Sequence, residues 1–274
     1  GTGKTPVVIA LARFLKEKGW RPGIVSRGYG GKIKHFPYQV HQNSNAREVG
    51  DEPLLIVRHT DCPTVIDPNR SRGVRALLKR AHCNLVISDD GLQHSSLGRN
   101  IEIIVVDGER RFGNNFCLPA GPLREPTSRL NSVDFVISKE NPLRHEFKLS
   151  LIPDHFYQLI QPKIKKTLDY FHGKTLHAVA GIGNPDQFFN SLRKLNLKII
   201  EHPFPDHYLF KPHDFSYGSD AIIIMTEKDA VKCVGFVDAR LWCLNTKTEL
   251  DTNLLNTVLK RVTTLNNNLK SSSG

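Results

Sequence analysis

The spacing of apolar residues divides the first half of the chain into alternating helices and strands. From Val7 to Leu15, apolar side chains recur at helical intervals, and Gly19 is a suitable helix stop. Helical spacing is also found around residues 52–58 and 69–80. Short apolar runs between polar or glycine residues predict strands at 21–26, 64–66, 84–88, 101–106 and 133–138. Strands that alternate with helices predict a parallel α/β sheet.

A second, smaller α/β unit is predicted in the remainder of the chain. The lysine-rich stretch 158–174 has a weak apolar signal and is expected to be a linker. We therefore expect two domains, 1–160 and 161–274. The strands expected after the linker begin at residues 176, 198, 221 and 240, and the helices at 185, 226 and 254.

Composition limits the classes of partner and of compartment. The 274 residues include 38 Lys and Arg against 27 Asp and Glu, a net charge of +11, which favours a polyanionic partner. The longest apolar runs, such as 221–225, are far shorter than the roughly 20 residues of a membrane span. Five scattered cysteines without a C-x-x-C pair argue against a disulfide scaffold or zinc site and favour a reducing cytosol.

The first residues, Gly1-Thr-Gly-Lys-Thr5, match the end of a phosphate-binding loop that opens a helix. Backbone N–H groups at a helix N-terminus favour phosphate. Lys4 would reach the β- and γ-phosphates, and the Thr5 hydroxyl would bind Mg²⁺. The alternative is a simple turn before a helix. Because the chain starts inside the motif, we expect that an N-terminal part of the natural protein precedes it.

Two acidic pairs strengthen the nucleotide interpretation. Asp89 and Asp90 directly follow an apolar strand, as in a Walker-B-like magnesium site. Asp51 and Glu52 would suit a helix N-terminus, where acids complement the dipole. In a kinase, Asp51 could instead accept the proton of the acceptor hydroxyl, and Glu52 could face the metal.

Other polar residues have plainer explanations. A lone histidine such as His207 is usually structural. In Thr226-Glu-Lys-Asp229, Thr226 is expected to cap a helix and Asp229 to complete a capping box. The clustered arginines, Arg124 among them, are either a solvated face or a surface for phosphate, anionic membrane or nucleic acid. No signature of an RNA- or DNA-binding module accompanies them.

Ten ordered motifs, which span residues 1 to about 245, resemble the tetraacyldisaccharide 4′-kinase family of Gram-negative bacteria. They are Gly1-Thr-Gly-Lys-Thr-Pro6, Ser26-Arg-Gly-Tyr-Gly-Gly31, Gly50-Asp-Glu-Pro53, Asp89-Asp-Gly-Leu-Gln-His94, Val106-Asp-Gly108, Arg111-Phe-Gly-Asn114, Leu118-Pro-Ala-Gly-Pro-Leu-Arg-Glu125, Ala180-Gly-Ile-Gly-Asn-Pro185, Phe204-Pro-Asp-His207 and Met225-Thr-Glu-Lys-Asp-Ala-Val-Lys-Cys233.

The resemblance implies a P-loop NTPase-like parallel-sheet domain with a second, smaller α/β domain that closes over ATP and Mg²⁺. It implies transfer of the γ-phosphate to the 4′-hydroxyl of a lipid A precursor, a disaccharide monophosphate. It further implies action at the anionic cytoplasmic face of the bacterial inner membrane, with no nucleic-acid partner. The family carries an N-terminal membrane-associated helix that this chain lacks.

The resemblance also implies roles for single residues. Asp51 resembles the base for the acceptor hydroxyl, and His207 resembles its partner from the second domain. The residues that resemble the nucleotide site are Gly1, Thr2, Gly3, Lys4 and Thr5, those of the metal site Thr5, Glu52, Asp89 and Asp90, and those of the substrate site Gln93, His94 and Arg124.

Two other classes of function remain open on the sequence. A P-loop GTPase or ATPase switch would share the phosphate loop, although the guanine-specifying N-K-x-D pattern is absent. A basic membrane- or nucleic-acid-binding module without catalysis would explain the charge but not the two acidic pairs.

Overall fold

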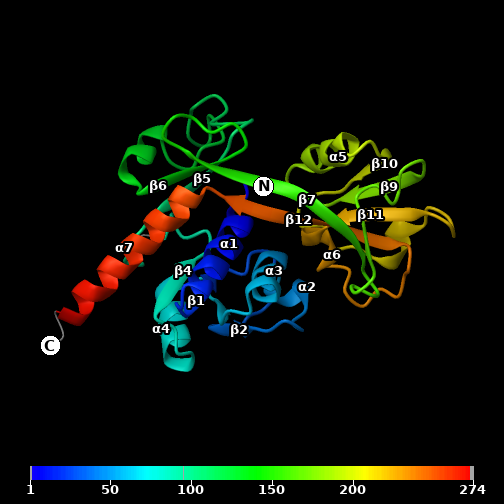
Figure 1. Cartoon of the computed structure of the whole chain (residues 1–274). Helices are drawn as coiled ribbons and strands as arrows, with labels where there is room; N and C mark the ends of the chain where they lie inside the picture. The colour runs from blue at the N-terminus through cyan, green and yellow to red at the C-terminus, as the bar shows by residue number, and fades with distance from the viewer. Residues whose placement is uncertain (1, 95, 272–274) are drawn as a thin grey trace.

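The computed structural model describes residues 2–94 and 96–271, which form two sheets with helices packed around them (Figure 1). The smaller sheet has four strands in the order β2-β3-β1-β4, and the larger is an eight-stranded sheet, counted over the described residues. The predicted mixed α/β fold with mostly parallel pairing is confirmed.

The smaller sheet is built by the first 90 residues. Helix α1 (Lys4–Glu17) buries the predicted apolar stripe, including Val7, Leu11 and Leu15. β1 pairs in parallel with β3 and with β4, whereas β2 pairs antiparallel at the edge. The elements that complete this part are β1 (Pro22–Ser26), β2 (Tyr38–Val40), α2 (Ala46–Val49), α3 (Asp51–Thr60), β3 (Thr64–Ile66), α4 (Arg70–Arg80) and β4 (Leu85–Ser88).

The larger sheet joins the two halves of the chain. Its order is β10-β9-β11-β12-β7-β6-β5, and β8 pairs with β7 off this path. Pairing is parallel on both sides of a single antiparallel seam between β12 and β7. The strands are β5 (Ile103–Asp107), β6 (Phe135–Lys139), β7 (Phe147–Gln158), β8 (Lys165–Lys166), β9 (Thr175–Ala180), β10 (Lys198–Pro203), β11 (Ile222–Thr226) and β12 (Leu241–Leu250).

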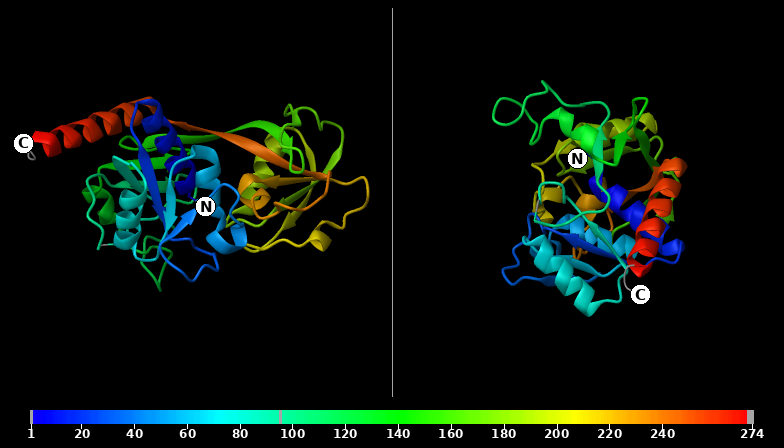
Figure 2. Two further views of the ribbon diagram at one scale, coloured as in Figure 1. Left: turned by 90° about the horizontal axis from the view of Figure 1, so that it is seen from below. Right: turned by 90° about the vertical axis from the view of Figure 1, so that its left-hand side faces the viewer.

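Helices and 3-10 turns cover the larger sheet and extend from it. They are η1 (Thr127–Ser132), α5 (Pro185–Lys194), η2 (Pro212–Phe215), α6 (Glu227–Ala230) and α7 (Thr252–Ser271). The C-terminal helix α7 packs Leu254, Val258 and Val262 against Val7 and Leu11 of α1. The last helix of the chain therefore lies beside the first one, as Figure 2 shows.

The connection between the halves differs from the expectation. The long strands β7 and β12 pair antiparallel and run from one half to the other. The stretch 158–174 is not a simple linker, because its Phe171 is fully buried in the core of the second half. A domain boundary near residue 160 stays a prediction.

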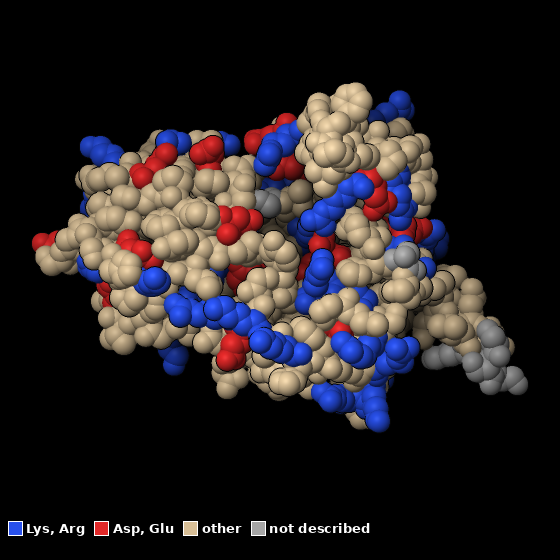
Figure 3. Space-filling view, turned by 180° about the vertical axis from the view of Figure 1, so that it is seen from behind, with Lys and Arg blue, Asp and Glu red and all other residues tan. Residues whose placement is uncertain are grey.

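The surface is rich in Lys and Arg on the face shown in Figure 3, with acidic side chains among them. Among the described residues, no helix combines the length and the apolar composition that crossing a bilayer requires.

Candidate active site

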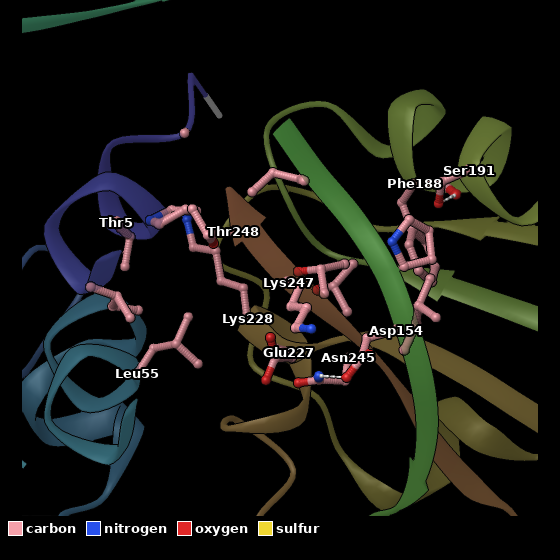
Figure 4. A pocket seen from close by; sticks show the side chains of 18 of the residues that line it. Thr5, Leu55, Asp154, Phe188, Ser191, Glu227, Lys228, Asn245, Lys247 and Thr248 are labelled. Carbon is pink, nitrogen blue, oxygen red and sulfur yellow. Dashed lines mark hydrogen bonds between the residues drawn. The ribbon is translucent and has the colours of Figure 1, made fainter. Parts of the chain in front are cut away.

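A large cavity opens where α1 faces the second half of the chain (Figure 4). Its volume is about 1870 Å³. Thr5 of α1 and Leu55 of α3 lie on one side, and Glu227 and Lys228 of α6 and Phe188 of α5 line it from the other half. Strands β7 and β12 form its floor between them, so both halves of the chain contribute to one site.

The phosphate-loop residues lie at the edge of this cavity. Thr2, Gly3, Lys4 and Thr5 all line it, whereas Gly1 falls outside the described residues. Gly3 has φ +96°, and a Cβ there would come within 2.7 Å of Leu149 Cδ2, so a glycine is required. The loop leads directly into α1, whose first N–H groups have no partner in the preceding turn of helix and suit an anion.

Lys4 and Asp90 bring two of the predicted elements together. Lys4 Nζ lies 3.1 Å from Asp90 Oδ1, and Arg124 Nη1 lies 3.9 Å from Asp90 Oδ2. Burial opposes ionisation of Asp90, but the charge and hydrogen bond of Lys4, and then Arg124, hold the pKa of Asp90 below its ordinary value. Asp90 is therefore ionised at neutral pH, beside the phosphate loop.

Asp89 has the opposite environment. Its side chain is 1% exposed, and Ser26 Oγ donates a hydrogen bond of 3.1 Å to Oδ2. Burial, reinforced by the negative charge of Glu52, raises the pKa of Asp89 to about 6. A cation at this place would offset that cost.

The donor atoms near Asp89 suit a hard cation. Carboxylate oxygens of Glu52, Asp89 and Asp90 and the Thr5 hydroxyl are the kind of ligand that Mg²⁺ prefers. Within residues 2–94 and 96–271, His, Cys, Asp and Glu side chains form no cluster of three or more that could hold a metal ion. A cation here would thus depend on phosphate oxygens and water as well, which is usual for Mg²⁺.

Asp51 and His207 meet across the two halves. His207 Nδ1 lies 3.1 Å from Asp51 Oδ2, and Asp51 is almost fully buried at the start of α3. Gly50 permits this approach, because it has φ +90° and a Cβ there would lie 2.6 Å from the Tyr29 carbonyl oxygen. The Tyr29 ring meets the His207 ring edge-on at 5.1 Å between centroids. The motifs that contain Tyr29, Gly50 and His207 therefore support one carboxylate.

Lys228 was missed by the sequence reasoning. Its Nζ lies 3.1 Å from Glu52 Oε1, 3.8 Å from Asp206 Oδ1 and 4.0 Å from Asp51 Oδ2. Burial favours the neutral amine, but Glu52, Asp51 and Asp206 together keep the pKa of Lys228 above its ordinary value. The ammonium group thus links the acidic pair of α3 to the second half.

A buried ion pair fixes the position of Lys228. Asp229 Oδ1 lies 2.6 Å from Lys232 Nζ, and both side chains are buried. Gly181 N donates to Asp229 Oδ2 at 3.1 Å, and Lys232 Nζ donates to the Gly181 carbonyl at 3.1 Å. The predicted cap is confirmed, since Thr226 Oγ1 accepts from Asp229 N, but the Asp229 carboxylate bonds to Gly181 and to the Thr226 hydroxyl.

The predicted substrate residues lie at the acidic end of the site. Arg124 approaches Asp90, and Gln93 Nε2 donates to Glu125 Oε1 at 3.1 Å. Burial, and then the positive charge of Arg70, lower the pKa of His94. Gln93, His94 and Arg124 therefore lie on the two turns that border Asp90.

The sequence was compared with known proteins. It matches the family model described as tetraacyldisaccharide-1-P 4′-kinase over residues 1–264. The chain is 51% identical over 243 residues to tetraacyldisaccharide 4′-kinase of Nitrosococcus oceani, which covers 88% of this chain and 71% of that protein. The kinase of Methylobacillus flagellatus is 48% identical over 267 residues, 97% of this chain and 79% of the relative.

The fold was compared with solved structures in the same way. The crystal structure of LpxK from Aquifex aeolicus in complex with ATP superposes with a TM-score of 0.77 at 27% identity. The match covers 96% of this chain and 85% of that chain. Sequence and fold agree, and the chain belongs to the tetraacyldisaccharide-1-P 4′-kinase family.

Proposed function

We propose that this chain uses Asp51 and His207 to transfer the γ-phosphate of ATP to the 4′-hydroxyl of a tetraacyldisaccharide 1-phosphate. The chain is an ATP-dependent kinase of the family named above. The observation that carries the residue assignment is the 3.1 Å contact between Asp51 and His207, next to acids that also meet the phosphate loop.

The phosphate loop holds the nucleotide. The N–H groups of Thr2 to Thr5 and the positive end of α1 bind the triphosphate, and Lys4 neutralises its outer phosphates. Phosphoryl transfer needs in-line placement and charge neutralisation more than covalent chemistry. In this proposal Lys4 leaves Asp90 for the phosphates when ATP binds.

Thr5, Glu52, Asp89 and Asp90 would hold Mg²⁺. The bound cation would neutralise charge on the transferred phosphoryl group. Asp89 supports this assignment because it is buried without a cationic partner in contact, while Ser26 holds its carboxylate in a fixed direction. Arg70 contributes the second support, donating to the Asp89 carbonyl at 3.2 Å.

Asp51 accepts the proton of the 4′-hydroxyl as that oxygen attacks the γ-phosphorus. Oδ2 is engaged by His207, which leaves Oδ1 beside its own helix N-terminus. His207 Nδ1–H donates to Oδ2 and fixes the carboxylate plane. Lys228 acts as a positioning residue, because it keeps the Asp51 and Glu52 carboxylates together in their ionised form.

Gln93, His94 and Arg124 are proposed to bind the sugar–phosphate part of the acceptor. Their place beside Asp90 puts acceptor and nucleotide at one end of the cavity. We place the reaction at the anionic cytoplasmic face of the inner membrane, where the net charge of +11 suits the lipid headgroups, and we assign no nucleic-acid partner.

ADP formation tests the proposal. The chain is assayed with MgATP, with and without the disaccharide monophosphate in detergent. We expect ADP to accumulate only when the acceptor is present. Acceptor-independent hydrolysis at the same rate would favour an ATPase switch, and binding without hydrolysis would favour a non-catalytic basic module.

A further inference from the structure

A loop after β5 presents apolar side chains to solvent in a fixed conformation. This projecting loop comprises residues 111–124. Figure 2 shows the segment, coloured between cyan and green, standing out from the sheet, and the projection at the top of Figure 3 is largely free of charged side chains. Asn114 Nδ2 donates to the Ala120 carbonyl at 2.9 Å, and Leu118 N donates to the Leu123 carbonyl at 2.8 Å. The loop is therefore closed by its own hydrogen bonds.

The tip of the loop is apolar. Phe116 is 62% exposed and Leu118 is 65% exposed. Leu143, on a neighbouring turn, is 61% exposed. Arg111 joins the two segments through hydrogen bonds of 2.8 and 2.6 Å to the Glu146 carboxylate. Single exposed apolar residues are normal in proteins, but here three are presented together by segments that are tied to each other.

Basic side chains border the apolar tip. Arg110, Arg124 and Arg144 are exposed around the base of the two segments. The charge of Arg111 is already matched by Glu146. An apolar tip above a basic rim is complementary to a bilayer whose hydrocarbon lies beneath anionic headgroups.

We infer that Phe116 and Leu118 enter the hydrocarbon edge of an anionic bilayer while the arginines at the base of the loop bind headgroups. The orientation rests on the proposed function: Arg124 lies 3.9 Å from Asp90, so insertion of the tip turns the acidic end of the site toward the membrane. A lipid acceptor could then reach the site without leaving the bilayer completely.

Co-sedimentation with vesicles of phosphatidylglycerol and phosphatidylethanolamine tests this inference. The Phe116→Ser/Leu118→Ser variant should partition about tenfold or more weakly than the unaltered chain, because each buried apolar side chain contributes to transfer from water. The matched control is Val234→Ser/Val237→Ser, which alters two exposed apolar side chains in the second half and should partition normally.

A tryptophan placed at the tip reports depth directly. In Phe116→Trp, vesicles with brominated acyl chains should quench the new fluorescence, and in Val237→Trp they should not. Equal partitioning of the loop variant and the unaltered chain, failure of the unaltered chain to bind these vesicles, or an unquenched Trp at position 116 would each overturn the inference. Self-association in the absence of lipid that the loop variant abolishes would assign the tip to a second copy of the chain, and would also overturn it.

The same variants separate this inference from the proposed function. Turnover measured with acceptor in detergent should be retained by the Phe116→Ser/Leu118→Ser variant, because the bilayer is absent. Loss of vesicle binding with normal detergent turnover supports the inference. Absence of kinase activity in the unaltered chain would contradict the proposed function and leave the fluorescence result to decide the membrane contact.

Discussion

His207 Nδ1 lies 3.1 Å from Asp51 Oδ2, although 156 positions separate the two residues. The contact joins the start of α3 to a turn of the second half, so the position of the carboxylate depends on both halves of the chain. Tyr29 packs on the edge of the same histidine ring. The arrangement leads to predictions that separate chemistry from binding.

Replacing Asp51 with Asn should reduce phosphoryl transfer by about 100-fold or more, because the amide cannot accept the hydroxyl proton. ATP affinity, measured by calorimetry, should stay within about threefold of the original, since the phosphate loop is intact. Asp61→Asn, at the exposed end of the same helix, is the control and should be fully active. Normal turnover in Asp51→Asn would remove Asp51 from the mechanism.

Replacing His207 with Asn tests whether the histidine acts through Asp51. Asn tolerates the φ of +59° at this position, so the turn should keep its shape. We expect kcat to fall by about tenfold or more with little change in KM for ATP. The double variant Asp51→Asn/His207→Asn should be about as slow as Asp51→Asn alone, because one residue works through the other. Additive losses would indicate that the two act separately.

Lys228→Met should lower kcat by about tenfold and move the acidic limb of the kcat/KM profile to higher pH. The reason is that Asp51 and Glu52 lose the ammonium group that favours their ionised forms. Lys228→Arg should restore part of both effects, and Lys198→Met, at an exposed position of β10, should change neither. An unchanged pH profile in Lys228→Met would show that Lys228 is structural.

Asp89 makes the folded state sensitive to pH. Its pKa is about 6 when folded against 3.8 for the unconstrained group, and about 2 pH units correspond to roughly 3 kcal/mol. The folded state therefore binds this proton more tightly, and the associated stability is lost as pH rises from about 4 to about 6.

Asp89→Asn should consequently be more stable than the unaltered chain, and by more at about pH 8 than at about pH 5, when both are melted in the presence of a chelator. Asp220→Asn, an exposed substitution, should give no such difference. MgATP should stabilise the unaltered chain more than Asp89→Asn. A stability difference that does not depend on pH would mean that Asp89 is not held in an unfavourable ionised state.

The sequence predicted the elements of the first half well, because each has a simple period. Apolar spacing located α1 and α4, and short apolar runs located β3 and β4. It did not locate β7, whose Pro153 breaks the signal of a strand. The register shift between Asn245 and Thr246 leaves Asp154 unpaired opposite them and lets the proline stay within the ladder.

The candidate site was predictable where polar residues follow strands, as at Asp89 and Asp90. Lys228 was not, because one lysine in the four-residue helix α6 carries no periodic signal and its partners lie 176 positions away. The contact between Asp51 and His207 was expected from resemblance alone, since no local pattern brings distant segments together. Long-range packing supplies what local periodicity lacks.

Transfer of labelled γ-phosphate from ATP to tetraacyldisaccharide 1-phosphate tests the central claim most directly. The unaltered chain should yield a disaccharide labelled at the 4′-position, with one ADP formed for each phosphate transferred. Asp51→Asn should yield almost none while it still binds ATP. Label released as inorganic phosphate by the unaltered chain, or equal product from Asp51→Asn, would contradict the account.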